Sequence, residues 1–193
     1  MSNDRLTQFR QRRDHFFGHD EQSPLSDKTR ASFTALDYYP ENPDLTLTLP
    51  LETNETDVGE PINLATSDGA AKPFTRAGRI TLPVEGKEVT LTVFRDVERG
   101  HYFLPFRDGT AGKTTYPVGR YLDVRARPDG QLIIDFNYAY NPYCAYSDGY
   151  SCPIPPQENV IGASIEAGER NFPAADQPAD NDQAGERGSA TEN

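Results

Sequence analysis

The apolar and polar positions of the chain follow one period near its start and another after Phe33. Residues 4–17 carry an apolar stripe at helical spacing, formed by Leu6, Phe9, Phe16 and Phe17. Ser2 or Asn3 can cap this segment and Gly18 can end it. The pattern predicts an N-terminal helix, which we expect to pack as a lid on the body. A helix that binds a partner or a membrane surface is the alternative.

After the helix, apolar residues alternate with polar ones, as in Leu45-Thr-Leu-Thr-Leu. Turn signals such as Ser67-Asp-Gly and Pro128-Asp-Gly separate the alternating runs. This spacing indicates short strands at 45–49, 58–65, 79–84, 89–94, 101–106, 119–126, 131–138 and 160–167. With no βαβ alternation, the chain is predicted to be mainly β: an antiparallel β-barrel or sandwich of about eight strands with an N-terminal helix.

Length and local composition divide the 193 residues into three parts. Residues 1–20 contain the helix, and residues 21–170 form a single all-β domain. Residues 171–193 hold five acids, one Arg, one aromatic residue and no Val, Ile or Leu. Such a segment buries too little apolar surface to offset its chain entropy, so we expect a disordered acidic tail.

The net charge of the chain argues against some classes of partner. The chain has 30 acidic residues against 19 basic ones, a net charge of −11, which argues against nucleic-acid binding. Only four of the basic residues are Lys, and excess acid with little Lys favours a halophilic protein over a mildly acidic mesophilic one. No apolar run is long enough to cross a membrane, and the first residues lack a secretory pattern. We therefore expect a cytoplasmic protein with no membrane partner.

Four sequence blocks are distinctive in the second half of the chain. They are Phe106-Arg-Asp with Thr115-Tyr and Gly119-Arg-Tyr-Leu, then Asp135-Phe-Asn-x-Ala-Tyr-Asn-Pro-x-Cys-Ala-Tyr, then Cys152-Pro-x-Pro-Pro-x-Glu-Asn, and finally Ala167-Gly-Glu. On these blocks the chain, over roughly residues 10–170, resembles a widespread bacterial and archaeal family, the domain-of-unknown-function family number sixteen eighty-four. The resemblance implies no activity and no catalytic residues, so the site is inferred from the side chains themselves.

The hairpin over 119–138 carries charge on an apolar face. If Asp129 and Gly130 form a two-residue turn, Val124 faces Asp135 and Leu122 faces Asn137. Arg120, Asp135 and Asn137 then interrupt one apolar face of the hairpin. Charged groups on such a face are costly unless they are paired or used. Either Arg120 joins Asp108 or Asp135 in a buried structural network, or it forms the polar floor of a barrel and binds a carboxylate or phosphate.

The second interpretation leads to our main functional hypothesis, a small-ligand or anion-binding β-barrel. Its predicted pocket is lined by Asp108, Thr115, Tyr116, Arg120, Asp135, Asn137, Tyr140 and Asn141. The alternative is a hydrolase- or lyase-type enzyme in which Asp108 or Asp135 is the base and Arg120 stabilises an anion. The stretch 108–116 is similar to a phosphate-binding loop but lacks the Walker spacing. No motif indicates a particular cofactor, and none fixes the oligomeric state.

The two cysteines offer a third hypothesis. Cys144 and Cys152 are eight residues apart in a Pro- and Tyr-rich loop. A metal- or thiol-dependent site could form on them, with His15, His19 or His101 as further ligands. Otherwise they are structural thiols or a disulfide that closes the loop, although the expected cytoplasmic compartment disfavours a disulfide.

Overall fold

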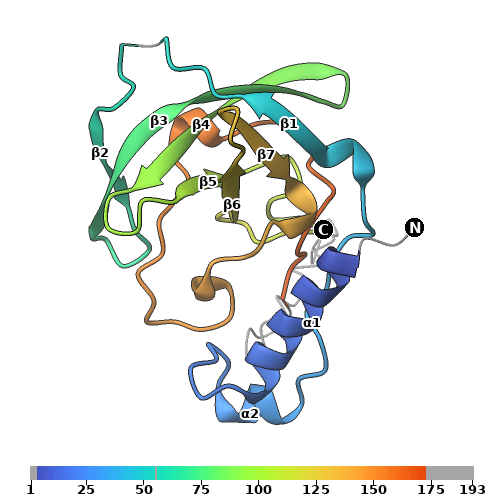
Figure 1. Cartoon of the computed structure of the whole chain (residues 1–193). Helices are drawn as coiled ribbons and strands as arrows, with labels where there is room; N and C mark the ends of the chain where they lie inside the picture. Colours follow the sequence, from blue (N-terminus) through green and yellow to red (C-terminus); the bar gives the residue numbers. More distant parts are fainter. Residues whose placement is uncertain (1–3, 55, 173–193) are drawn as a thin grey trace, which may run out of the picture.

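The computed structural model describes residues 4–54 and 56–172, and its main element is one seven-stranded antiparallel sheet (Figure 1). The mainly-β prediction is therefore confirmed. In the order of the sheet, the strands are β1 (Thr46–Pro50), β7 (Gln131–Asp135), β6 (Arg120–Ala126), β5 (Tyr102–Phe106), β4 (Lys87–Asp96), β3 (Ala71–Val84) and β2 (Pro61–Ala65). The α-helices are α1 (Asp4–His19) and α2 (Asp27–Ala31). Short 3₁₀ helices lie further along the chain, at Pro43–Leu45, Phe136–Tyr138, Tyr143–Ala145 and Gln157–Asn159.

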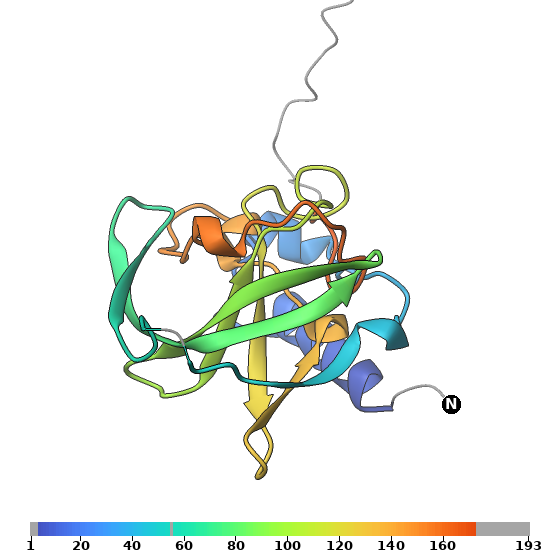
Figure 2. The same ribbon diagram turned by 90° about the horizontal axis from the view of Figure 1, so that it is seen from above.

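The sheet coils strongly but is not closed into a barrel (Figure 2). Just past β1, Glu52 forms a single antiparallel bridge with Arg79 of β3, through N–H···O bonds of 2.8 and 2.9 Å. The neighbouring Gly78 has a φ of +149°, and a Cβ there would lie 2.5 Å from the Glu52 carbonyl oxygen. Glycine thus permits the close approach, and among the described residues this single bridge joins the chain after β1 to β3, the strand next to the other edge of the sheet.

The coil encloses the main apolar core. Its central side chains are at most 2% exposed and include Leu82, Leu91, Leu104, Leu122 and Ile134. A second cluster lies on the opposite face of the sheet, around Phe74, Phe94, Phe103 and Tyr121. Because successive strand residues point to opposite faces, β6 contributes Leu122 to one cluster and Tyr121 to the other.

The register of the β6–β7 hairpin differs from the prediction by one residue. Arg125 pairs with Ile133, and Ala126 with Leu132. The Arg127 N–H donates to the Gln131 carbonyl, so the connection is one residue longer than a two-residue turn and ends on Gly130 at a φ of +82°. A shift of one residue exchanges the faces of a strand. As a result β7 turns Asp135 away from the core, and the predicted pairing of Asp135 with Val124 is wrong.

Two strand predictions also need correction. The strand predicted at 79–84 is the second half of the longer β3. The segment 160–167 is not a strand: it forms one parallel bridge between Val160 and Arg107, and then runs as irregular backbone. Its alternation of buried residues is real, since Ala163, Ile165 and Ala167 belong to the core. Its main chain bonds to the main chain of Arg107 and Gly109, and from Ile165 onward mainly to side chains, as described below.

The N-terminal helix lies against the body of the protein (Figure 1). Phe17 is fully buried beside Leu25 and Leu36, and the Phe9 ring lies 4.9 Å from that of Tyr138. The proposed caps Ser2 and Asn3, and all of the predicted tail beyond Phe172, lie outside the described residues. Within residues 4–54 and 56–172, no helix combines the length and the hydropathy needed to cross a membrane.

Candidate functional site

Arg120 and Asp108 form a buried ion pair inside the coil. Both side chains are at most 1% exposed, and the Arg120 Nη2 lies 3.2 Å from the Asp108 Oδ1. The same guanidinium donates to the main-chain carbonyls of Ile165, Ala167 and Glu169. The other carboxylate oxygen of Asp108 accepts from the Ile165 N–H at 2.8 Å and from the Thr110 hydroxyl at 2.8 Å. The pair is thus bonded to the backbone of residues 165–169.

Several other predicted pocket residues are also engaged inside the protein. The Thr115 hydroxyl lies 2.7 Å from that of Thr110, next to Asp108. Asn137 is 1% exposed and exchanges hydrogen bonds with the main chain of Asn42. Asn141, also 1% exposed, donates through its side chain to the Arg170 carbonyl. The structure brings Arg120, Asp108 and Thr115 together, whereas Asn137 and Asn141 brace separate turns.

A second buried charge cluster was not anticipated from the sequence. Glu169 is 1% exposed and accepts from Arg13 at 2.8 Å, from the Asn141 N–H at 3.1 Å and from the Tyr146 hydroxyl. Burial raises the pKa of Glu169, and the contacts with Arg13 and Tyr146 oppose that rise. The cluster ties α1 to the loop that follows β7 and to the end of the described chain.

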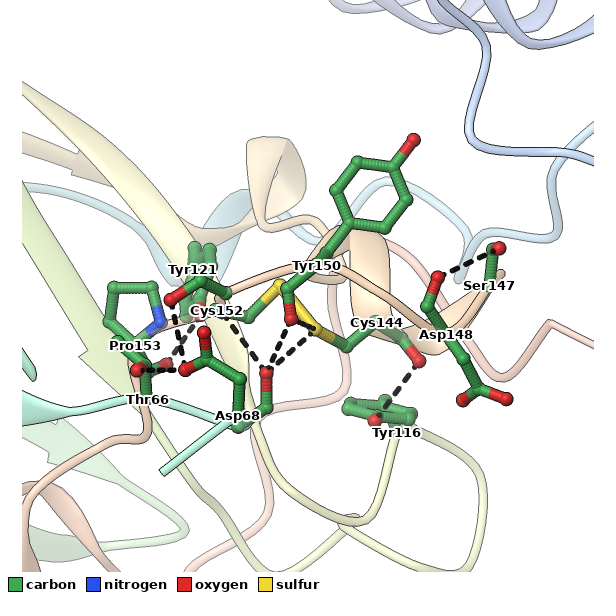
Figure 3. The surroundings of a disulfide bond; sticks show 12 residues. Thr66, Asp68, Tyr116, Tyr121, Cys144, Ser147, Asp148, Tyr150, Cys152 and Pro153 are labelled. Carbon is green, nitrogen blue, oxygen red and sulfur yellow. Dashed lines mark hydrogen bonds between the residues drawn. A yellow bond between two sulfur atoms is a disulfide. The ribbon is translucent and has the colours of Figure 1, made fainter. Parts of the chain in front are cut away.

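The cysteines form a disulfide within the loop after β7 (Figure 3). The Cα atoms of Cys144 and Cys152 are 6.4 Å apart, within the range of disulfides. Ser67 lies beside the bond: its hydroxyl donates to the Tyr150 carbonyl, and it accepts from the Cys152 N–H. Tyr116 donates to the Cys144 carbonyl at 3.3 Å (Figure 3). Among the described residues there is no free cysteine and no cluster of three or more metal-ligating side chains.

An open groove of about 710 Å³ lies on the outer side of β6 and β7. Its floor comes from the outward positions of the two strands, Asp123, Arg125, Ile133 and Asp135. It is completed by residues of α1, of the β4–β5 turn and of the chain after β7: Arg5, Phe9, Arg99, His101, Tyr138 and Tyr140, with Leu122 and Val124 at its edge. Of the eight predicted pocket residues, Asp135 and Tyr140 line this groove.

A chain of three polar side chains runs along one wall of the groove. The Tyr140 hydroxyl donates to Asp123 Oδ2 at 3.1 Å, and Asp123 Oδ1 lies 3.5 Å from His101 Nε2. Burial raises the pKa of Tyr140 well above its ordinary value, and Asp123 adds to the rise. The tyrosine therefore stays protonated and holds the Asp123 carboxylate in place beside the imidazole.

The groove gathers positive charge in an otherwise acidic protein. Three arginines and one histidine face two aspartates there. Arg125 lies over the Tyr138 ring at 5.9 Å from its centroid. Within the described parts of the chain, Arg5, Arg99 and Arg125 form no ion pair with an acidic side chain. Their guanidinium groups are exposed and are available to a ligand.

Comparison with known proteins agrees with the four distinctive sequence blocks. Residues 31–170 match the family described as "Protein of unknown function (DUF1684)". The chain belongs to this family. Among solved structures, the solution NMR structure of the uncharacterized protein from gene locus rrnAC0354 of Haloarcula marismortui is 35% identical and superposes with a TM-score of 0.66. The match covers 86% of this chain and 92% of that one. No curated protein matches the chain.

The DUF1684 blocks map mainly onto the buried networks rather than onto the groove. Arg120, Asp108, Asn141, Cys144, Cys152 and Glu169 all lie within them. Arg99, His101 and Arg125 were not predicted as pocket residues, because the charged residues of the β6–β7 hairpin were expected on its inner face. The alternation Tyr121-x-Asp123-x-Arg125 places Asp123 and Arg125 on the outer face of β6, but no pattern in the sequence brings Arg99 and His101 to them.

Proposed function

We propose that this protein binds a small organic anion in the groove on the outer side of β6 and β7. The observation that carries the proposal is a set of three arginines, Arg5, Arg99 and Arg125, around one groove of about 710 Å³, none of which forms an ion pair within the described residues. This volume is within the range of about 300–1,000 Å³ that is typical of ligand pockets. The proposal keeps the anion-binding hypothesis and assigns it to a site outside the coil.

Charge supports an anionic ligand. The whole chain has a net charge of −11, yet the groove has more basic than acidic side chains. Guanidinium groups bind carboxylates and phosphates through paired N–H donors, and no acidic side chain of the described residues occupies those of Arg99 or Arg125. A local excess of positive charge on a negative protein also draws anions to that one place.

Apolar and aromatic side chains support an organic ligand over an inorganic ion. Phe9, Tyr138 and Tyr140 line the groove. Ile133 lies on its floor and is 38% exposed, although a strand residue of this type is usually covered. A flat ring or short hydrocarbon chain would cover Ile133 while its acid group lies near the arginines.

Buffer at low ionic strength suits the test, because salt screens exposed charges. Benzoate is titrated into ¹⁵N-labelled full-length protein, with benzyl alcohol as the neutral probe of similar shape. We expect benzoate to shift the amide signals of residues 99–101, 123–125 and 133–135, and benzyl alcohol to shift them far less. Replacement of one guanidinium, Arg125→Gln, is expected to weaken benzoate binding about fivefold to tenfold.

Arg127→Gln is the matched control. Arg127 lies at the tip of the same hairpin, is paired with Asp129 at 3.1 Å, and does not line the groove. The Arg127→Gln variant should bind benzoate with the same affinity as the unchanged protein. The proposal is wrong if the two variants weaken binding equally, or if benzoate produces no localised shifts.

A further inference from the structure

Histidine is the side chain whose charge ordinarily changes near neutral pH, and the groove is lined by one histidine, His101. It lies beside Asp123, which Tyr140 holds by a hydrogen bond. We propose that the groove takes its ligand as a dianion and that His101 supplies the matching second positive charge by taking up a proton. This inference rests on the proposed function and names the class of its ligand: a dicarboxylate or a phosphate monoester.

The groups around His101 set its charge balance. The groove holds Arg5 from α1, Arg99 from the β4–β5 turn, Asp123 and Arg125 from β6, and Asp135 from β7. Beside the groove, Asp96 and Glu98 are matched in charge by Arg95, whose Nε donates to the Gly100 carbonyl, and by Arg10, which attracts Asp135. With a neutral imidazole these ionised groups leave one surplus positive charge, and with a protonated imidazole they leave two. Tyr140, from the chain after β7, stays protonated because burial raises its pKa.

The register of β5 and β6 explains why the imidazole and Arg125 act on one ligand. Tyr102 pairs with Val124, and Phe103 pairs with Asp123. Continuing that register by one residue sets His101 opposite Arg125, at the point where the strands part. A ligand acid group that reaches the Arg125 guanidinium is therefore near the imidazole as well.

Proton uptake then follows from linkage. Without a ligand, a protonated His101 adds a charge of the same sign as the three arginines of the groove. A bound dianion removes the repulsion and adds attraction, so the ligand and the proton each bind more tightly in the presence of the other. A monoanion is already neutralised by the one surplus positive charge that the groove carries when His101 is neutral. Protonation of His101 therefore strengthens its binding less.

The nearest competing function for these side chains is a metal site. His101, Asp123 and Asp135 carry ligand atoms that metals accept. In the described residues, however, no three such groups come together around one point. Asp123 already contacts both Tyr140 and His101. We therefore assign His101 the role of a charged partner for the ligand and not that of a metal ligand.

The test compares benzoate with isophthalate, a ring of the same size that carries two carboxylates, by calorimetry at about pH 5.5 and about pH 8. We expect isophthalate to bind about fivefold tighter at the lower pH, and benzoate to change by less than twofold. Repeating the isophthalate titration near pH 6.5 in two buffers with different heats of protonation should reveal proton uptake.

Substitutions assign the effect to His101. His101→Gln should bind isophthalate weakly at both pH values, and His101→Lys should bind it tightly at both. His15→Gln, on the exposed part of α1 where His15 stacks on His19, is the matched control and should keep the full pH dependence.

The outcomes separate the two proposals. If neither anion binds at either pH, the proposed function fails and this inference fails with it. If both anions bind, but isophthalate shows no pH dependence or keeps it in His101→Gln, only the dianion inference is wrong. A lack of proton uptake in the two buffers would overturn it in the same way.

Discussion

The Arg120 guanidinium lies 3.2 Å from the Asp108 carboxylate, and the two side chains together bond the backbone of Ile165 from both sides. Arg120 donates to the Ile165 carbonyl and Asp108 accepts from its N–H, each at 2.8 Å. In a sheet a neighbouring strand would supply these two partners. Here an ion pair supplies them, so its principal effect is on the position of a core segment.

Removing Asp108 should therefore be severe. Asp108→Ala leaves a buried guanidinium without its counter-ion and the Ile165 N–H without an acceptor. We expect a loss of about 3–5 kcal/mol in the free energy of unfolding, measured by urea denaturation. Asp129→Ala, which breaks the pair with Arg127 in which both partners are 48% exposed, should change stability by less than about 1 kcal/mol. Equal losses would contradict the structural role of the pair.

The contact between Gly78 and Glu52 makes a second prediction. A Cβ at Gly78 would lie 2.5 Å from the Glu52 carbonyl oxygen, which neither strand can avoid without moving. Gly78→Ala should cost about 1–3 kcal/mol more than Gly69→Ala, as measured by thermal or urea denaturation. Gly69 also has a positive φ, +82°, but nothing lies within 4 Å of its Cβ position. The extra cost at Gly78 combines the clash with its more extreme φ of +149°. Equal losses in the two variants would mean that Glu52 and Arg79 can move apart without cost.

The disulfide gives a third prediction. Protein unfolded without reductant should show no reactive thiol, and after reduction it should show two. The double variant Cys144→Ser with Cys152→Ser should lose about 2–3 kcal/mol of stability, because its short loop is no longer closed in the unfolded chain. Reduced unchanged protein should match the variant. Two reactive thiols before reduction would instead favour the structural thiols that a cytoplasmic location suggests.

The buried Glu169 leads us to predict that the stability of the protein depends on pH. Burial raises its pKa, so the folded state holds a proton more tightly than the unfolded chain does. The associated stability is fully present below the unfolded pKa of about 4.3 and is lost as pH rises through the folded value. The stability difference between the unchanged protein and Glu169→Gln should therefore shift in favour of the unchanged protein on acidification. Urea denaturation across the acidic range measures it.

Glu166→Gln provides the control for this comparison, because Glu166 is exposed and lies three residues earlier in the same segment. Its difference from the unchanged protein should stay nearly constant over the same range. If acidification instead lowers the stability of the unchanged protein relative to Glu169→Gln, then Arg13 and Tyr146, rather than burial, determine the direction of the pKa shift of Glu169.

The strand pattern could be predicted from the sequence because period-two alternation reports directly which face of a strand is buried. The register of the β6–β7 hairpin could not, because Pro128-Asp-Gly suits both a two-residue turn and a longer one, and one residue decides which face Asp135 occupies. The buried pairing of Arg120 with Asp108 was one of two alternatives drawn from the charge on an apolar face.

The groove was beyond such reasoning for a different reason. Arg5 and Arg125 are 120 positions apart in the chain, and each resembles an ordinary exposed arginine of a helix or a strand. Only the packing of α1 over the outer side of the sheet makes them neighbours of one cavity. Tertiary proximity of this kind leaves no periodic signal in the sequence.

The irregular segment 160–169 has a consequence for the order of folding. Its hydrogen-bond partners Arg107, Asp108 and Arg120 are in position only once β5 and β6 have paired, so the segment can dock only onto a sheet that already exists. Interactions that form after the folding transition state slow unfolding without speeding folding. We therefore expect the Arg120–Asp108 pair to form after the folding transition state. Its loss should raise the unfolding rate and leave the folding rate almost unchanged.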